Sequence, residues 1–239
     1  MKRPSVSVIV PARDEAFTIP LIPKLVPRMG KWTDIIFVEG FSKDGTWGEI
    51  SKLKTTNSKL RIRKFRQTRK KGKAGAVEIG FKKAKGEILM ILDADLSVHP
   101  KYLKSCYKLL ASGRADFANA SRFFYPREKG AMKYFNHLGN RFFAFVFSLV
   151  LKQKITDTLC GTKALFRRDY RKMLPLTRKV RKIDPYSDFT LLMGASRLKL
   201  KVAEVPVRYK ARVYGESKIS PFWDGLKLIH ILISQILSK

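Results

Sequence analysis

The stretch Ile88-Leu89-Met90-Ile91-Leu92-Asp93-Ala94-Asp95 joins five consecutive apolar residues to two carboxylates. An apolar run of this length predicts a strand covered on both faces, as in parallel sheets flanked by helices. Ligands of such sheets bind beyond the carboxyl ends of the strands. Because Mg²⁺ and Mn²⁺ prefer oxygen ligands and often bridge carboxylates to phosphates, Asp93 and Asp95 are candidate metal ligands. The spacing alone also fits a solvated loop.

Around this stretch, short apolar runs alternate with helical patterns, which indicates an α/β fold with a mostly parallel central sheet flanked by helices. Strands are expected at 6–10, 35–38, 62–65, 88–92, 117–120, 164–166 and 202–209, and helices at 46–54, 75–85 and 100–111. The second half is less regular, which predicts a mixed arrangement there. We expect one catalytic domain over 1–218 and an amphipathic C-terminal helix over 219–239.

The charge balance points to an anionic partner, since 50 Lys and Arg against 19 Asp and Glu leave a formal charge of +31. Such charge attracts nucleic acid, anionic lipid or phosphorylated substrates. The chain shows no zinc-finger spacing, RNA-binding aromatic signature or recognition helix, so nucleic acid has no further support. Two cysteines favour a reducing compartment. The N-terminus lacks a signal-peptide pattern, so we expect a cytoplasmic location.

Seven short segments, in order along the chain, carry a resemblance to a known family. They are VIVPARDE at 8–15, VE at 38–39 with SKDGT at 42–46, GKAGA at 72–76, LDADLS at 92–97, ASRF at 120–123, DTLCGTK at 157–163, and EVPV at 204–207 with RVYGESK at 212–218. Together they resemble family 2 glycosyltransferases with the GT-A fold, especially polyprenyl-phosphate sugar synthases. One departure is Glu39-Gly40, where the family usually has two adjacent aspartates.

The resemblance implies a donor site for a GDP- or UDP-sugar. The residues expected to line the nucleoside pocket are Pro11, Arg13, Glu15, Val38 and Glu39. Lys73, in a basic loop ahead of a helix, would offer charge to the donor, although a solvated loop fits equally well. Asp93, Ala94 and Asp95 would face the diphosphate.

The resemblance also suggests how the diphosphate is neutralised. Asp95 would be the principal ligand of a Mg²⁺ or Mn²⁺ ion, with Asp93 beside it and Ser97 a weaker candidate. Arg212 and Lys218 flank Gly215 on a segment that closes over donor phosphates in relatives. Their charges would stabilise the leaving group without proton transfer. A solvated surface lysine is the alternative for Lys218.

For the acceptor, the resemblance implies a polyprenyl phosphate, whose phosphate oxygen is already a nucleophile. Arg122 would hold this phosphate, or the sugar, through a bidentate contact. The segment 130–151 is strongly apolar, and apolar residues recur at helical spacing over 222–236, so each is either a core helix or an interfacial one. With the high positive charge, they favour peripheral attachment to an anionic cytoplasmic membrane face. The apolar run 142–151 is too short to cross a bilayer, so any membrane-spanning segment would belong to an integral membrane partner.

Two alternatives stay open. A hydroxyl acceptor on a saccharide or small molecule would need a carboxylate base. Asp188 is the candidate for that base, although a helix cap explains it equally well. From another class, the chain could be a non-catalytic basic module that binds nucleic acid or anionic membrane, for which the two aspartates would be dispensable. We expect an inverting, metal-dependent transferase that uses a polyprenyl phosphate.

Overall fold

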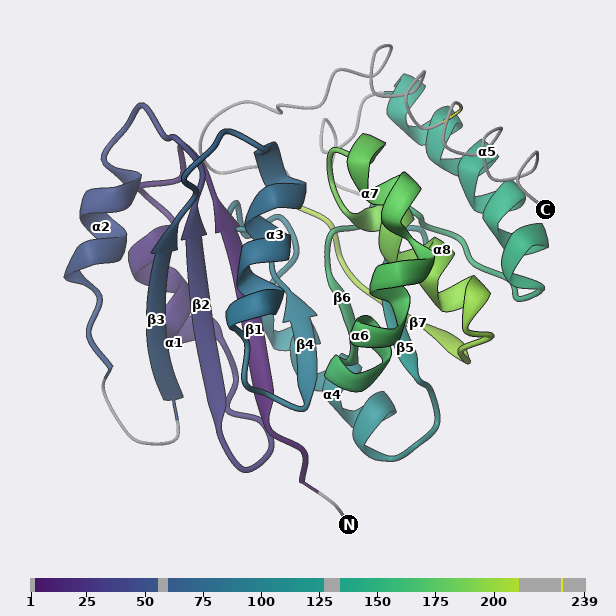
Figure 1. Ribbon diagram of the computed structural model, residues 1–239, viewed down its shortest axis with the longest axis horizontal. Coiled ribbons are helices and arrows are strands. Elements are labelled where there is room, and N and C mark those ends of the chain that lie inside the picture. Colours follow the sequence, from purple (N-terminus) through teal and green to yellow (C-terminus); the bar gives the residue numbers. More distant parts are fainter. Residues whose placement is uncertain (1–2, 56–59, 127–133, 211–228, 230–239) are drawn as a thin grey trace.

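The computed structural model describes residues 3–55, 60–126, 134–210 and 229. These residues form a seven-stranded sheet in the order β3-β2-β1-β4-β6-β5-β7 (Figure 1). The strands are β1 Val6–Ala12, β2 Thr33–Glu39, β3 Leu60–Arg66, β4 Ile88–Ile91, β5 Phe117–Ser121, β6 Lys163–Phe166 and β7 Val202–Pro206. The strand-forming runs found in the sequence therefore all lie in one sheet.

The sheet is parallel in its first half and mixed in its second, as predicted. Strands β3, β2, β1 and β4 pair in parallel, while β6 runs antiparallel to both β4 and β5. Strand β7 is parallel to β5. The last strand ends at Pro206 rather than 209, and Tyr209 instead forms an isolated bridge with Val98. The Val207 amide makes the last contact with β5, donating to the Ser121 carbonyl at 3.0 Å, and Ser121 is the residue at which β5 itself ends.

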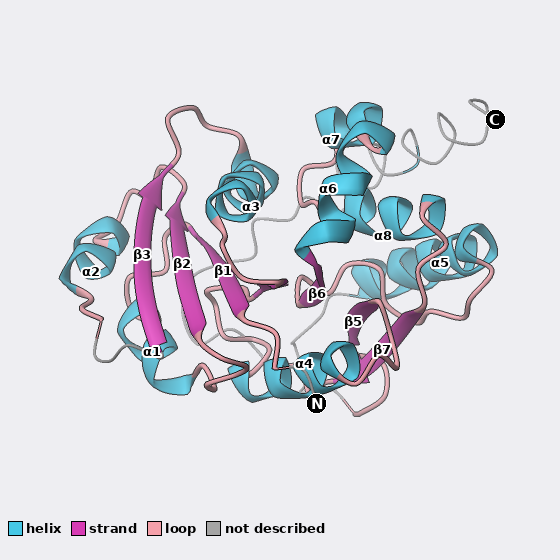
Figure 2. Cartoon of the chain, turned by 60° about the horizontal axis from the view of Figure 1, so that its bottom comes forward, coloured by secondary structure: helices cyan, strands magenta, loops and turns pink. Residues whose placement is uncertain are grey.

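Helices cover both faces of the sheet (Figure 2). They are η1 Ile19–Leu21, α1 Ile22–Leu25, α2 Thr46–Lys52, α3 Gly72–Lys83, η2 Pro100–Tyr102, α4 Leu103–Ala111, α5 Tyr134–Leu151, α6 Arg167–Leu176, α7 Arg178–Ile183 and α8 Asp188–Arg197. Helices α3, α5, α6 and α8 lie on one face, and α1 and α4 on the other. This layering matches the predicted α/β class.

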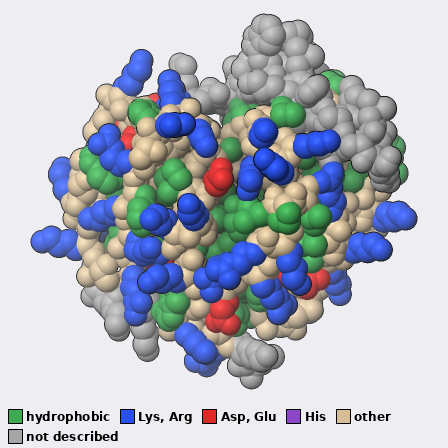
Figure 3. All heavy atoms as spheres, viewed as in Figure 1, with side chains coloured by type: hydrophobic (Ala, Val, Ile, Leu, Met, Phe, Trp, Pro, Cys, Tyr) green, Lys and Arg blue, Asp and Glu red, His purple; other side chains and the backbone are tan. Residues whose placement is uncertain are grey.

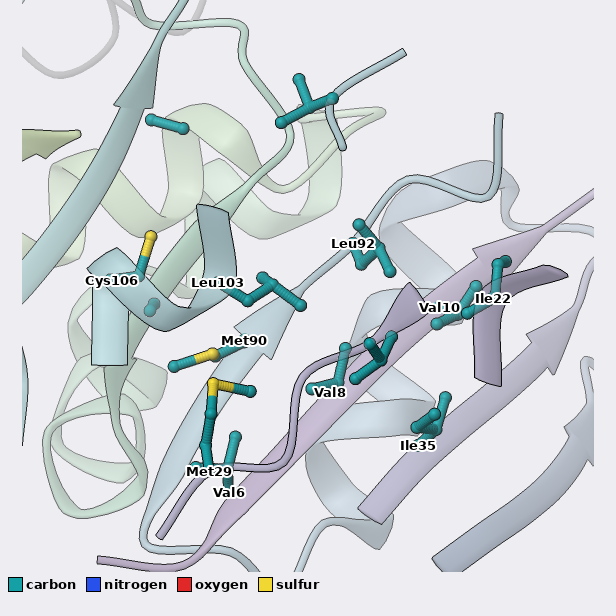
Figure 4. Close-up of a cluster of buried hydrophobic side chains, with 14 of the residues drawn as sticks. Val6, Val8, Val10, Ile22, Met29, Ile35, Met90, Leu92, Leu103 and Cys106 are labelled. Carbon is teal, nitrogen blue, oxygen red and sulfur yellow. The ribbon is translucent and has the colours of Figure 1, made fainter. Parts of the chain in front are cut away.

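Side-chain alternation along each strand divides the buried core into two clusters. In β1, Val6, Val8 and Val10 belong to the cluster with α1 and α4, whereas Ile9 belongs to the cluster with α3 and α8. Figure 4 shows the first cluster, where the β1 valines lie on one side of the sheet with Leu103. Both sides of β1 and β4 are therefore buried, which explains their continuous apolar sequences.

Helix α5 has one buried and one exposed apolar side. Phe143 and Phe147 pack edge-on against Phe189 of α8, with ring centroids 5.2 and 4.7 Å from it. The exposed side carries large apolar residues at helical spacing, each more than half exposed: Leu138, Phe142, Phe145 and Leu149. No helix in the described part of the chain is long and apolar enough to cross a bilayer. The predicted helix at 219–239 and the boundary at 218 fall outside the described residues.

Candidate active site

The carboxyl ends of β1, β2 and β4 lie side by side at one edge of the sheet (Figure 1). Pro11 pairs with Val38, and Ala12 with Glu39, at the ends of β1 and β2. Strand β4 is in register with β1 through Ile9 and Ile91, and the Leu92 amide extends this pairing by donating to the Ile9 carbonyl at 2.9 Å. The predicted nucleoside residues and the two aspartates therefore share one edge, where ligands of parallel sheets bind.

Asp93 forms an ion pair with Lys73, whose Nζ lies 2.5 Å from the Asp93 Oδ1. Burial disfavours the ammonium, but Asp93 and Asp188, and to a lesser extent Asp95, outweigh it and raise the pKa of Lys73. Asp93 is in direct contact with Lys73, and the charges of Asp188 and Asp95 act on it as well. Because opposite charges this close favour the ionised forms, Lys73 remains a cation throughout the physiological pH range.

The prediction of a loop around Lys73 is wrong, because Gly72 to Gly75 form the first turn of α3. Two contacts allow the helix to start this early. The Ala74 amide donates to the Pro185 carbonyl at 3.0 Å, and the Lys71 amide donates to the Gln67 Oε1 at 3.1 Å. Both satisfy amides that the first turn of a helix leaves without intrahelical partners. Lys73 therefore projects from a fixed turn toward Asp93.

Asp95 is held by the segment that follows it. Its Oδ1 accepts hydrogen bonds from the Ser97 amide at 3.0 Å and from the Ser97 hydroxyl at 2.8 Å. The chain turns sharply here, with Leu96 at a φ of 56°. This arrangement fixes the carboxylate that the sequence singled out as the main metal ligand.

The donor set fits a hard divalent cation. Asp93 and Asp95 offer carboxylate oxygens, Ser97 offers a hydroxyl, and Lys73 shows that this cluster already binds a positive charge. Among the described residues, no group of three or more His, Cys, Asp or Glu forms a closed metal cage. The two carboxylates suit Mg²⁺ or Mn²⁺, which are commonly held by one or two carboxylates together with substrate phosphates.

The loop between α5 and β6 connects the parts of the site. Lys163, at the start of β6, is fully buried, and its Nζ lies 2.7 Å from the Asp188 Oδ1 and 2.5 Å from the Cys160 carbonyl oxygen. The Thr158 carbonyl also accepts from it at 3.3 Å. Lys163 therefore ties the loop to the start of α8. Sequence reasoning assigned it no role, although a lysine opening the apolar run Ala164 to Phe166 is a signal of a buried, paired cation.

Arg122, directly after β5, makes its bidentate contact with Asp157. Its Nε and one terminal nitrogen lie 2.7 and 2.9 Å from the two Asp157 oxygens, and its guanidinium stacks over the Tyr209 ring at 5.0 Å. Burial alone would raise the pKa of Asp157, but Arg122 holds it below its usual range. Asn140 of α5 also donates to this carboxylate at 2.7 Å. Arg122 therefore holds the start of the loop between α5 and β6 at Asp157, while Lys163 holds its end.

At the nucleoside end, Glu39 is buried, and its two oxygens have separate partners. One accepts from the Ser42 amide at 2.5 Å, and the other from the Arg66 Nε at 3.1 Å. A side chain at Gly40 would press on the Gln67 amide group, 2.9 Å from a Cβ placed there. A small residue after Glu39 thus leaves room for Gln67.

The loops after β1 and β2 are joined by hydrogen bonds into one frame. The Asp14 amide donates to the Ser42 hydroxyl, the Lys43 amide to the Asp14 Oδ1, and the Glu15 amide to the Thr46 hydroxyl, at 2.7 to 3.1 Å. Within this frame Phe41 has a φ of 60° and is 42% exposed. Bulky residues rarely adopt this left-handed conformation, and strain of this kind concentrates at functional sites.

Replacing Phe41 with glycine should stabilise the protein. Relief of left-handed strain is worth about 1–2 kcal/mol, and the extra freedom of glycine in the unfolded chain offsets about 0.4–1 kcal/mol of it. Chemical denaturation should show a free energy of unfolding higher by about 0.5–1 kcal/mol. Lys199→Gly is the matched control, since Lys199 has a φ of 52° outside this frame and should gain similarly. A loss of stability in Phe41→Gly alone would show that the ring packs favourably.

Gly161 permits the close approach of the loop at 157–161 to the Lys73–Asp93 ion pair. A Cβ placed there would collide with both Asp93 oxygens and the Lys73 ammonium. Because these are the ends of flexible side chains, Gly161→Ala should fold but separate the ion pair. We expect nucleotide affinity, measured by calorimetry, to fall by at least about tenfold with little change in melting temperature. Gly113→Ala, where a Cβ meets nothing within 4 Å, controls for the substitution; equal affinity in both variants would contradict this role.

The structure brings most of the predicted residues together. Lys73, Asp93, Asp95 and Asp188 form one electrostatic cluster, and the 157–161 loop connects it to Arg122. Pro11, Val38 and Glu39 lie on the neighbouring strand ends, with Arg13 and Glu15 in the loop that follows β1. Ala94 is buried between the two aspartates. Arg212 and Lys218 fall outside the described residues.

Comparison with known proteins supports the same interpretation. Residues 7–174 match the model of Glycosyl transferase family 2. The chain is 30% identical to the Drosophila melanogaster dolichyl-phosphate beta-glucosyltransferase, with 93% of the chain and 71% of that protein aligned. It is 27% identical to glycosyltransferase AglD of Haloferax volcanii, covering 92% of the chain but about a third (35%) of that protein.

A solved structure shares the fold. The glucosyl-3-phosphoglycerate synthase of Mycobacterium tuberculosis, in complex with Mn²⁺, UDP and glucosyl-3-phosphoglycerate, aligns with a TM-score of 0.65 at 18% identity. The alignment covers 97% of the present chain and 79% of that protein. At this identity the likeness establishes the GT-A architecture expected from the sequence.

Proposed function

Since the chain belongs to glycosyltransferase family 2, we propose that it transfers a sugar from a nucleotide-diphosphate sugar to a polyprenyl phosphate, with inversion at the anomeric carbon. The observation that carries this proposal is the Lys73–Asp93 ion pair beside the Asp95 carboxylate, which Ser97 holds in place, at the carboxyl edge of the sheet. Such a cluster suits a substrate that carries both a diphosphate and a bound cation. Family membership also favours an enzyme over a non-catalytic basic module.

The chain's own groups would position and stabilise the reactants. The β1 and β2 ends hold the nucleoside, and Lys73 directs a positive charge toward the diphosphate. A phosphate oxygen of the acceptor forms the new bond to the anomeric carbon while the sugar's bond to the diphosphate breaks, and the nucleoside diphosphate leaves with the electron pair. Asp93, Asp95 and Ser97 would hold Mg²⁺ or Mn²⁺, which supplies stabilisation of the charge that builds on the leaving group.

The lipid acceptor and the membrane location have separate support. The Drosophila relative is named for dolichyl phosphate, and the acceptor's anionic oxygen needs no protein base. The exposed apolar side of α5 and the charge of +31 suit attachment to an anionic membrane surface on the cytoplasmic face. Any membrane-spanning segment would belong to an integral membrane partner.

A hydroxyl acceptor is a second candidate because Asp188 belongs to the electrostatic cluster with Lys73, Asp93 and Asp95. Its Oδ1 is 2.7 Å from the buried Lys163 Nζ, and its charge also acts on Lys73. The buried Lys163 ammonium already occupies this carboxylate oxygen, so a hydroxyl acceptor would have to compete with a buried ion pair. This contact pattern favours the phosphate acceptor over the hydroxyl.

The proposal is tested by offering donor and acceptor together. A panel of GDP- and UDP-sugars is incubated with polyprenyl phosphate or free glycans, with Mn²⁺ or with EDTA, and products are identified by mass spectrometry. We expect a metal-dependent polyprenyl-phosphate sugar. Transfer only to glycans would support the Asp188 alternative, and a lack of any metal-assisted nucleotide binding by calorimetry would contradict the donor site.

Lys218→Ala should mainly slow transfer. A preorganised charge on a leaving diphosphate contributes a few kcal/mol, so we expect kcat to fall by about a hundredfold with a smaller change in donor KM. Steady-state kinetics with saturating acceptor measures this. Lys239→Ala, another lysine of the C-terminal segment, is the control, and equal rates for the two variants would make Lys218 a surface residue.

A further inference from the structure

The Lys73 ammonium contacts a carboxylate that the donor's cation would also use. Its Nζ lies 2.5 Å from the Asp93 Oδ1, and Asp95, held by Ser97, lies two residues further along the same segment. A divalent cation held by Asp93 and Asp95 would meet this ammonium at the shared carboxylate. Because like charges at this range repel each other where water is partly excluded, the two cations compete for Asp93.

The burial of this ion pair sets it apart from the many other cations of the chain. Figure 3 shows many lysine and arginine side chains and few acidic ones on one face of the molecule. A contact between a surface lysine and a carboxylate is therefore of little significance alone, as with Lys52 and Glu49, where the lysine side chain is 73% exposed. The Lys73 side chain is only 22% exposed. Solvent and salt screen such a partly buried pair less than an exposed one, so its competition with a second cation is stronger.

Lys73 combines a fixed backbone with a side chain that is able to change partner. Its neighbour Ala74 is bound to the Pro185 carbonyl at 3.0 Å, which holds the first turn of α3 in place, whereas the lysine stem has four flexible carbons. The charge of Asp188 also acts on Lys73, and Asp188 is itself held by Lys163 at 2.7 Å. The ammonium can therefore leave Asp93 without becoming an isolated buried charge, because the charge of Asp188 stays behind.

We propose that Lys73 couples cation binding to nucleotide binding by exchanging Asp93 for the donor diphosphate. Without a nucleotide, Lys73 stays on Asp93 and opposes a divalent cation there. With a nucleoside diphosphate bound, the phosphate oxygens accept hydrogen bonds from the ammonium, and Asp93 becomes available to the cation. The inference rests on the proposed function for the donor site. It adds that cation and nucleotide each bind weakly alone and strengthen each other reciprocally.

Binding of Mn²⁺ without nucleotide tests the competition directly and needs no turnover. Lys73→Met removes the charge and keeps the side-chain length, so electron paramagnetic resonance of unbound Mn²⁺ should show binding at least about tenfold tighter than in wild type. Lys73→Gln should repeat this result, whereas Lys73→Arg keeps the charge and should bind Mn²⁺ as weakly as wild type. A Mn²⁺ affinity that is the same in all three variants and in wild type would overturn the proposal.

Lys71→Met is the matched control for the loss of one positive charge near the site. Lys71 is exposed and lies two residues before Lys73, and no carboxylate in the described part of the chain lies within ion-pair distance of it. Its Mn²⁺ affinity should equal that of wild type. An equal gain in Mn²⁺ affinity in Lys71→Met and Lys73→Met would show a general effect of charge and would refute the specific role of Lys73.

The nucleotide provides the second readout. Calorimetry of GDP and UDP with and without Mn²⁺ gives the factor by which Mn²⁺ raises nucleotide affinity. We expect this factor to be at least about tenfold larger in wild type than in Lys73→Met, because the exchange contributes only where the lysine is present. An equal factor in the two proteins would show that Lys73 stays on Asp93 throughout, and would contradict the exchange.

Thermal melting shows that the variants fold and gives a third readout. Without a cation, Lys73→Met should melt below wild type, and Mn²⁺ alone should raise its melting temperature more than that of wild type. A smaller rise than in wild type would contradict the competition. If these differences appear but the wild type transfers no sugar, the proposed function fails while the cation exchange stands. If the wild type transfers sugar but Lys73→Met binds Mn²⁺ no more tightly, the exchange fails alone.

Discussion

Asp95→Ala should abolish metal-dependent sugar transfer while leaving the protein folded. The amide and hydroxyl of Ser97 hold one oxygen of this carboxylate in place. Loss of a group that stabilises the transition state in this way costs about a hundredfold or more in kcat. Turnover is measured across a Mn²⁺ titration, and circular dichroism and thermal melting confirm the fold.

The comparison with Asp116→Ala separates a site effect from a general loss of charge. Asp116 accepts from the Lys201 amide at 3.0 Å at the opposite end of β5, away from the catalytic edge. This variant should keep its Mn²⁺ dependence and its rate. Mn²⁺-assisted binding of UDP or GDP provides a readout independent of turnover, and wild-type binding and rate in Asp95→Ala would remove the metal assignment.

Asp157→Ala should be the most destabilising of the single substitutions considered. It leaves the guanidinium of Arg122 buried without its carboxylate, a change that typically costs about 3–5 kcal/mol. It also removes the acceptor used by the Leu159 and Cys160 amides, both at 3.1 Å. For a chain of this size the melting temperature should fall by roughly 6–20 °C. Glu49→Ala, which removes only an exposed pair with Lys52, should cost at most about 1 kcal/mol.

The difference in free energy of unfolding between wild type and Asp157→Ala should depend on pH with a definite sign. Because the folded-state pKa of Asp157 is lowered, its ionised form stabilises the protein above the unfolded-state value near 3.9, and this contribution disappears as the pH falls through the folded-state value. The gap in free energy of unfolding between wild type and Asp157→Ala should therefore be constant near neutrality and shrink in acid. A gap that stays constant down to pH 2 would show that the ion pair is not its source.

Much of the fold was predictable because each strand carries a local signal. Buried parallel strands appear as continuous apolar runs, and the turn residues between them mark the ends, so the bounds predicted for β1 to β4 lie within two residues of those observed. The loop predicted around Lys73 failed for a non-local reason. The first turn of α3 depends on the Pro185 carbonyl, which is more than a hundred residues away in the chain.

The site was predictable in its members but not in its connections. The motifs identified Asp93, Asp95 and Arg122, yet the sequence offered no way to see that Asp157 occupies the Arg122 guanidinium. The burial of Lys163 and the strain at Phe41 are likewise results of tertiary packing. Pairings between charged residues far apart in the chain depend on the folded geometry, and a chain with 50 basic residues offers many alternatives.

The central claim is that the acidic cluster after β4 binds the cation and the diphosphate of the donor. A crystal grown with Mn²⁺ and GDP or UDP tests it most directly, because anomalous scattering locates the metal independently of any model. We predict a manganese peak at the Asp95 carboxylate, in contact with the nucleotide diphosphate, with the nucleoside between the ends of β1 and β2. A nucleotide bound elsewhere, with no anomalous peak beside Asp95, would contradict the account.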